Sequence, residues 1–232
     1  MRAYLSAASL VAVLTAGPVL PQDSPVVVEL FTSQGCSSCP AADAVLTELA
    51  GRDDVIALAL HVDYWDYIGW ADVFAQPDFT TRQQGYAHAA GARVVYTPQM
   101  MIGGLDSIIG TDTMALMDGI SAHATARPSV RLGLSRSNDV LSIMAAAIGP
   151  VEGPLSVQLI RYLPAQVVDI KRGENAGRSI TYSNVVTSWE VLGDWDGAAP
   201  LDIDMPLTGS DPVVVILQRL GPGLIVAAAR LR

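Results

Sequence analysis

The sequence predicts an α/β N-terminal domain followed by an all-β C-terminal domain, the second being an antiparallel sandwich or a barrel. Two observations carry this prediction. Apolar runs at residues 25–31 and 54–62 flank a helical pattern, which is the order of a β-α-β unit. After Pro128 the chain changes to short alternating runs that Gly, Pro, Asn and Asp separate, without helices between them. We therefore expect residues 23–127 and 128–232 to form the two domains.

The composition is that of a globular chain. Half of the 232 residues are hydrophobic and 16% are charged, so the chain can bury a core of ordinary size. The net charge of -9 disfavours nucleic acid and anionic membranes as main partners, because both attract proteins through Lys and Arg. We exclude nucleic-acid binding on this ground.

The first 22 residues have the pattern of a secretory signal peptide. Arg2 supplies a positive charge, residues 3–16 are apolar or small, and Gly and Pro residues then end the stretch. An uncleaved membrane anchor is the alternative, although a comfortable membrane span needs about 20 apolar residues. We expect an exported protein, periplasmic or secreted, without stable membrane insertion after removal of the signal.

The N-terminal domain begins with a β-α-β unit. Residues 25–31 contain three successive valines, which is typical of a strand buried on both faces. A helix is predicted from Cys36 to Gly51, and a second buried strand follows at residues 54–62. The two strands should be parallel, with a right-handed crossover. The apolar residues of the helix recur at Ala41, Val45 and Leu49.

The rest of this domain is predicted less regularly. One or two helices are expected around residues 79–90. Residues 93–102 form a strand that Thr97-Pro98 interrupts, and a proline at such a place needs a reason because it removes a ladder donor. A Gly-Gly hairpin turn, a short strand at residues 105–110 and a helix over 111–126 complete the domain.

Cys36 and Cys39 are the two cysteines of the chain. A disulfide between them closes almost no loop, so it stabilises the fold little. The pair opens a helix, where unpaired N–H groups and the positive end of the dipole favour a thiolate. We expect Cys36 to be the exposed nucleophile and Cys39 the resolving thiol. Zinc is disfavoured because a second Cys pair is missing, and an inert structural pair is the other alternative.

Polar and aromatic residues follow the second predicted strand at its carboxyl end. Ligands bind at that edge of open α/β sheets, and Cys36 lies at the same edge. Trp65 and Asp63 are therefore candidates for the wall of a substrate groove, with packing between domains as the alternative. His61 is interpreted as a core histidine rather than a ligand. Residues 172–178 (RGENAGR) lack the ending of a phosphate loop and predict a hairpin turn, which in a second interpretation leans over the redox site.

The motif CSSCP at residues 36–40, followed by a second strand, helices and Thr97-Pro98 before a hairpin, resembles the thioredoxin superfamily over residues 24–127. The resemblance implies a thioredoxin-like fold for this domain, with a cis Pro98 facing the disulfide and Thr97 pairing with the substrate backbone. A trans proline at a strand edge is the alternative. The resemblance also implies that Glu29 accepts a proton from the inner cysteine, unless it is a strand-end carboxylate that faces water.

A closer resemblance is to the DUF1223 family of secreted bacterial proteins, whose function is unknown. The stretches that carry it are VELFTSQGCSSCPAAD (residues 28–43), HVDYWDYIGW (61–70), VVYTPQMMIGG (94–104) and RGENAGRSITYSNVV (172–186). They lie in both predicted domains.

The sequence thus favours an exported thiol–disulfide oxidoreductase that acts on protein or small-molecule thiols and disulfides, without a dissociable cofactor or a metal. Two alternatives from other classes remain. In one, the thiolates hold Cu(I), with His61 or a methionine as the third ligand. In the other, the β-rich domain binds a partner and the redox pair is not catalytic.

Overall fold

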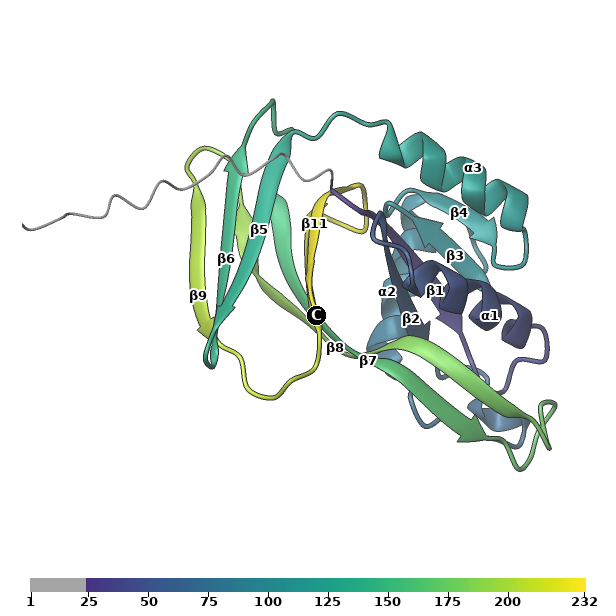
Figure 1. Ribbon diagram of the computed structural model, residues 1–232. Coiled ribbons are helices and arrows are strands. Elements are labelled where there is room, and N and C mark those ends of the chain that lie inside the picture. The colour runs from purple at the N-terminus through teal and green to yellow at the C-terminus, as the bar shows by residue number, and fades with distance from the viewer. Residues whose placement is uncertain (1–23) are drawn as a thin grey trace, which may run out of the picture.

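The computed structural model describes residues 24–232, so the predicted signal peptide at residues 1–22 lies outside the described residues. Within that range the chain forms three α-helices, one 3-10 turn and eleven strands (Figure 1). The helices are α1 (Cys39–Ala50), α2 (Pro77–Ala89) and α3 (Thr113–Ala124), and the 3-10 turn η1 spans Asp66–Ile68. The strands are β1 (Val26–Thr32), β2 (Val55–His61), β3 (Gln99–Ile102), β4 (Asp106–Ile109), β5 (Val130–Ser137), β6 (Val140–Ala147), β7 (Leu155–Asp169), β8 (Ser179–Trp195), β9 (Leu201–Pro206), β10 (Val213–Arg219) and β11 (Ile225–Leu231).

Eight strands form one mixed sheet in the order β11-β10-β7-β8-β2-β1-β3-β4. Strands β5, β6 and β9 form a second, antiparallel sheet that stands beside β7, β10 and β11 (Figure 1). An apolar core fills the space between the two sheets, with Leu141 and Ile143 of β6 packed in the same cluster as Val157 of β7 and Val215 of β10. Such a two-layer arrangement follows from alternating strands, because each sheet has one apolar face to bury.

The prediction of an α/β thioredoxin-like domain next to a separate all-β domain was wrong. The described chain is mostly β, and β8 lies beside β2 with Ala59 paired to Val185, so strands from both halves of the chain share one sheet. A hydrophobic core is shared as well, since it joins Val27 of β1 to Ile160 of β7 and Ile216 of β10. The physical reason is the length of β7 and β8, which have 15 and 17 residues where the sequence predicted short strands.

The β-α-β unit itself forms as predicted. Strands β1 and β2 are parallel, from the pair Val26 and Val55 to the pair Thr32 and His61, and every residue of both strands is buried. Helices α1 and α3 cover one face of these strands, because their apolar residues share a cluster with alternate residues of β1 and β2. Helix α2 covers the opposite face through Phe79. The carboxyl ends of β1 and β2 therefore meet at one edge of the sheet.

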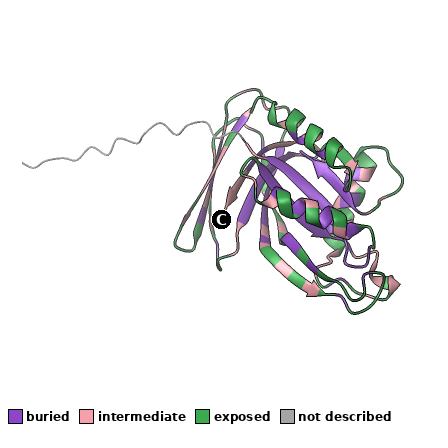
Figure 2. Cartoon of the chain, turned by 45° about the vertical axis from the view of Figure 1, so that its right-hand side comes forward, coloured by how far each residue is buried: buried purple, intermediate pink, exposed green. Residues whose placement is uncertain are grey.

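The outer half of the β7–β8 hairpin, residues 162–186, forms an arm that extends alongside helix α1 (Figure 1). Thr47 of α1 and Ser183 of β8 share a hydrogen bond of 3.0 Å between their hydroxyl groups. Buried residues gather in the central strands, whereas the outward residues of the arm are exposed (Figure 2). The tip of the arm is the segment 170–178, and the arm carries it to the edge of the sheet where β1 ends.

Between residues 24 and 232, no helix has both the length and the apolar character needed to span a bilayer.

Candidate functional site

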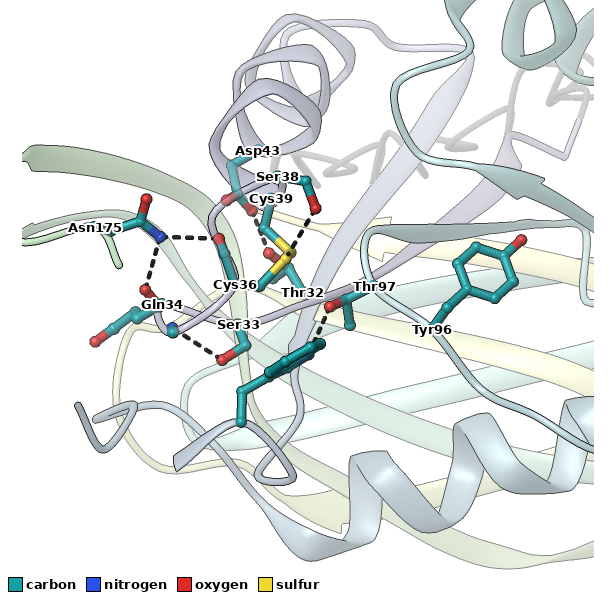
Figure 3. Close-up of a disulfide and its surroundings, with 12 residues drawn as sticks. Thr32, Ser33, Gln34, Cys36, Ser38, Cys39, Asp43, Tyr96, Thr97 and Asn175 are labelled. Atoms are coloured by element: carbon teal, nitrogen blue, oxygen red, sulfur yellow. Dashed lines mark hydrogen bonds between the residues drawn. A yellow bond between two sulfur atoms is a disulfide. The ribbon is translucent and has the colours of Figure 1, made fainter. Parts of the chain in front are cut away.

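The site is built around the Cys36–Cys39 disulfide, which follows β1 and opens helix α1 (Figure 3). The two Cα atoms are 5.4 Å apart. A tight turn carries the chain from the strand to the helix, in which the Cys36 amide donates to the Ser33 carbonyl at 3.2 Å and the Gly35 amide donates to Ser33 Oγ at 3.1 Å. Pro40 sits in the first turn of the helix, where no N–H group is needed. The local sequence thus places both sulfurs at the positive end of a helix dipole, as predicted.

Cys36 is not exposed, which corrects the expectation of an exposed nucleophile. Its exposed fraction is 3%, and that of Cys39 is 0%. The tip of the arm contacts the backbone of this loop through Asn175, whose Nδ2 donates to the Cys36 carbonyl at 2.8 Å and to the Gln34 carbonyl at 2.9 Å (Figure 3). The interpretation in which residues 172–178 lean over the redox site is therefore confirmed.

Three of the predicted site residues lie together on the side of the disulfide loop away from the arm tip. Trp65 Nε1 donates to Thr97 Oγ1 at 2.7 Å. A Cβ atom on Gly35 would lie 3.2 Å from the Trp65 carbonyl oxygen, so the indole-bearing loop packs directly against the turn before Cys36. The Thr97–Pro98 peptide bond is cis, as the resemblance implied. Trp65, Thr97 and Pro98 thus border the disulfide loop.

The carboxylates of Asp63 and Glu29 form their hydrogen bonds away from the disulfide. Asp63 Oδ1 accepts from Thr80 Oγ1 of α2 at 2.6 Å. The Glu29 side chain lies on the α2 face of β1, where it accepts from Arg82 Nε at 2.6 Å and from the Tyr86 hydroxyl at 2.6 Å. It is fully buried and does not face water, yet the sheet separates it from α1. The structure does not bring these two carboxylates to the disulfide.

Asp43 is the carboxylate that does lie beside the disulfide, and the sequence reasoning missed it (Figure 3). It stands four residues after Cys39 on α1, a spacing that puts two side chains on one face of a helix. Thr32 Oγ1 at the end of β1 donates to Asp43 Oδ1 at 2.9 Å. Burial raises the pKa of the Asp43 carboxyl to about 7, with nearby His61 and the Thr32 hydrogen bond opposing that rise. Asp43 can therefore give or take a proton near neutral pH.

A second buried pair stands behind Asp43. His61 Nδ1 and Asp72 Oδ2 are 2.7 Å apart, and neither side chain is exposed to solvent. The interpretation of His61 as a core histidine is confirmed, because Phe74 and Tyr182 pack their rings against its imidazole. Asp72 also accepts from the Gln34 amide at 2.8 Å, which ties the pair to the loop that carries Cys36. Asp72, Tyr182 and Thr32 were not predicted, since nothing in the residues around them indicates contact with Asp43 or His61.

No group of three or more His, Cys, Asp and Glu side chains suited to a metal ion occurs in the part of the chain that the structure describes.

Comparison with known proteins gives a family and a fold. The DUF1223 model, described as a protein of unknown function, matches residues 27–218. A crystal structure of a protein from Agrobacterium tumefaciens is similar, with 33% identity and a TM-score of 0.79 over 90% of this chain and 95% of that chain. HBP35 of Porphyromonas gingivalis resembles it in fold alone, with 17% identity and a TM-score of 0.58 over 90% of this chain and 75% of that chain. No curated protein matches the chain. The family match extends over most of the sequence, and the chain therefore belongs to the DUF1223 family of proteins of unknown function.

Proposed function

We propose that this chain is an exported thiol–disulfide oxidoreductase whose redox centre is the Cys36–Cys39 pair. The single observation that carries the proposal is the disulfide at the start of α1 with the Asp43 carboxyl one helical turn further on. Helix N-termini favour thiolates, and a proton acceptor beside the inner sulfur completes the set of groups that disulfide exchange needs. The thioredoxin-like order of the elements around residues 36–40 and 97–98 supports the same chemistry.

The oxidising direction begins with a substrate thiolate that attacks Cys36 Sγ. The Cys36–Cys39 bond breaks, its electron pair goes to Cys39 Sγ, and a mixed disulfide joins the substrate to Cys36. A second substrate thiolate then attacks the substrate sulfur of this mixed disulfide and releases Cys36 as a thiolate. The substrate dithiol is oxidised to a disulfide, and the Cys36–Cys39 disulfide is reduced to two thiols once both sulfurs hold protons. The reducing direction is the reverse of these steps.

In this scheme Asp43 exchanges a proton with Cys39. In the oxidising direction the protonated carboxyl gives its proton to the Cys39 thiolate as that thiolate leaves. In the reducing direction the ionised carboxylate takes the proton from the Cys39 thiol, which then attacks the mixed disulfide. With a pKa of about 7, the carboxyl is present in both forms near neutral pH, so it serves both directions.

The residues that border the disulfide loop would position the substrate. Trp65 offers a partly buried indole next to the turn that carries Cys36, held by its hydrogen bond to Thr97. The protein or peptide that carries the substrate thiols would lie across Trp65, Thr97 and Pro98. Access also needs movement of the loop around Cys36, because Cys36 is 3% exposed and the Asn175 bond to its carbonyl restrains that loop.

Export belongs to the proposal because such disulfides persist in oxidising compartments. The signal-peptide pattern of residues 1–22 is the other support.

The test is a redox titration of the mature protein in glutathione buffers, with alkylation of the thiols at each point and no added metal. We expect a two-electron transition with a midpoint between about -120 and -270 mV, and oxidation of a reduced dithiol peptide by the disulfide form. Cys39→Ser should trap the peptide as a mixed disulfide on Cys36. Cys36→Ser is the matched control and should trap none, because Cys39 is fully buried.

Failure of the pair to cycle, or trapping by Cys36→Ser and not by Cys39→Ser, would overturn the proposal. Alkylation that begins only after a chelator is added would favour soft-metal binding instead.

A further inference from the structure

Buried polar atoms without a protein partner concentrate around the disulfide. Among the described residues, six buried side-chain N or O atoms have no hydrogen-bond partner. Five of them belong to side chains that surround the Cys36–Cys39 loop or Asp43. These five are Gln34 Nε2, Asp43 Oδ2, His61 Nε2, Asn175 Oδ1 and Tyr182 Oη. Buried polar groups are rarely left without a partner in proteins, so such a concentration calls for a cause.

Three of these atoms belong to neighbouring side chains behind Cys39, Asp43, His61 and Tyr182, and we refer to the place where these side chains meet as the niche. Thr32 and His61 are register partners in the parallel pair β1–β2, so their side chains lie next to one another on the α1 face. The Thr32 hydroxyl donates a hydrogen bond to the Asp43 carboxyl. The centre of the Tyr182 ring, which belongs to the arm, lies 4.9 Å from the centre of the His61 ring. Strand, helix and arm thus bring the side chains of His61, Asp43 and Tyr182 next to one another.

The donors and acceptors of this niche follow from Asp72. Its carboxylate accepts from the backbone amides of Gln34 and Phe74 at 2.8 and 2.9 Å, so it acts as an anion toward His61 as well. The His61 Nδ1–H then points at Asp72, and Nε2 on the other edge of the ring is left for the niche. Tyr182 keeps its proton because burial raises the pKa of its hydroxyl far above the ordinary value.

The three atoms therefore offer the hydrogen-bond partners that a buried water molecule needs. A buried water makes about three hydrogen bonds to groups that lack other partners. Here it would accept from the Tyr182 hydroxyl, share a hydrogen bond with His61 Nε2, and donate to Asp43 Oδ2 when that carboxyl is ionised. When Asp43 is protonated, the same water turns and accepts from its O–H. Both protonation states of Asp43 are then satisfied without movement of the protein.

We propose that His61 and Tyr182 hold a buried water against Asp43 Oδ2, and that this bridge sets the pH at which Asp43 exchanges its proton with Cys39. His61 and Tyr182 are positioning residues in this scheme, because they touch the water and not the sulfurs. The role in proton exchange rests on the proposed oxidoreductase function, whereas the water site and its effect on Asp43 do not.

The other charged or titratable groups of the cluster are all acids. Asp72 faces His61 from the loop after β2, and the Asp66 carboxyl of η1 accepts from the Asp72 amide at 3.0 Å. Cys36 and Cys39 face Asp43 from the loop and from α1, and Tyr182 faces it from β8. Loss of the hydrogen bonds that stabilise the Asp43 carboxylate should therefore raise its pKa, since the nearby Asp72 carboxylate also disfavours its charged form.

The first test is Tyr182→Phe, which removes one hydroxyl and keeps the ring. We expect the titration of Asp43 in the oxidised protein, followed by the carboxyl carbon resonance that Asp43→Asn removes, to move upward by about one pH unit. His61→Phe should move it in the same direction. Tyr162→Phe, a buried tyrosine of the core shared by β1 and β7, is the matched control and should leave it unchanged.

The second test is a high-resolution crystal structure of the oxidised protein, in which we expect an ordered water at hydrogen-bond distance from the three atoms. Absence of that water, or an unchanged Asp43 titration in Tyr182→Phe, would overturn the inference.

Both readouts use the oxidised protein, so they remain readable even if the disulfide never accepts electrons from a substrate. If the disulfide does cycle, a plot of its reduction potential against pH should change slope at a pH about one unit higher in Tyr182→Phe. That shift corresponds to a tenfold higher proton affinity of Asp43. A shift of the Asp43 titration without a shift of that slope would retain the water and refute its role in proton exchange.

Discussion

Asn175 and Cys36 are 139 positions apart in the chain, yet the Asn175 amide group donates to the Cys36 carbonyl oxygen at 2.8 Å. The same Nδ2 atom also donates to the Gln34 carbonyl at 2.9 Å. One side chain at the tip of the arm thus binds two carbonyl groups of the loop that leads into the redox pair. The contact makes the C-terminal half of the chain part of the site.

Replacement of Asn175 should loosen the loop that carries Cys36 and so make the disulfide easier to reach. In Asn175→Ala both hydrogen bonds are lost, and each contributes on the order of 1 kcal/mol. We expect reduction of the Cys36–Cys39 disulfide by a small thiol to become about tenfold faster, because the opened arm is more populated. The measurement is the rate of thiol appearance under dithiothreitol. Glu174→Ala, an exposed neighbour on the same tip, is the control. Equal rates of disulfide reduction in wild type and Asn175→Ala would show that the Asn175 hydrogen bonds do not restrict access to the disulfide.

Asp43 should make the stability of the protein fall as the pH rises. The pKa of its carboxyl is raised by burial from 3.8 to about 7, so the folded state holds a proton that the unfolded state releases. The contribution to stability is complete below pH 3.8 and is lost as the pH rises to about 7. Between pH 5 and pH 8 the loss amounts to about 3 kcal/mol.

Asp43→Asn, which cannot ionise, should lack this fall. Urea unfolding of the oxidised protein at the two pH values measures it, with Asp118→Asn on α3 as a control at an exposed position. Parallel pH profiles of wild type and Asp43→Asn would disprove the raised pKa.

Glu29 should affect stability without affecting redox chemistry. Its carboxylate pairs with Arg82, whose side chain is 13% exposed and also lies 3.8 Å from the Trp189 ring. Glu29→Gln leaves this guanidinium without its anion in the core, which typically costs about 3 kcal/mol. The pH dependence of the Cys36–Cys39 potential should stay as in wild type, whereas Asp43→Asn should change it. A changed pH dependence in Glu29→Gln would return the role of proton acceptor to Glu29.

Trp65 should act on the substrate and not on the potential. Trp65→Phe removes the indole N–H that donates to Thr97 and keeps an aromatic side chain at this position. We expect kcat/KM for oxidation of a dithiol peptide to fall about fivefold, which corresponds to a loss of about 1 kcal/mol. Thr97→Val removes the other partner of the same bond and should have a similar effect. A shifted potential in either variant would mean that the bond supports the disulfide loop itself.

Part of the site was predictable because short-range patterns encode it. The valines of β1 and the helix that starts at the Cys pair are local features, and the structure forms them as expected. Asp43 carried a signal that could have been used, since it is four residues after Cys39. The helix face was predicted from Ala41, which is exposed, whereas Ala42, Asp43 and Leu46 are buried. An acid on the Cys39 face of the helix was therefore readable as a buried proton acceptor.

The sequence by itself determined the β-α-β unit, the position of the cysteines at the start of a helix and the family of the chain, because each depends on neighbours within a few residues or on a contiguous motif. The tertiary structure alone decided that Asn175 and Tyr182 belong to the site and that Glu29 does not. Those outcomes depend on the path of the long β7–β8 hairpin and on which face of the sheet each side chain occupies. Apolar alternation predicts that a strand exists, but not how long it is or which strand it will lie beside, since those depend on packing against residues more than 100 positions away.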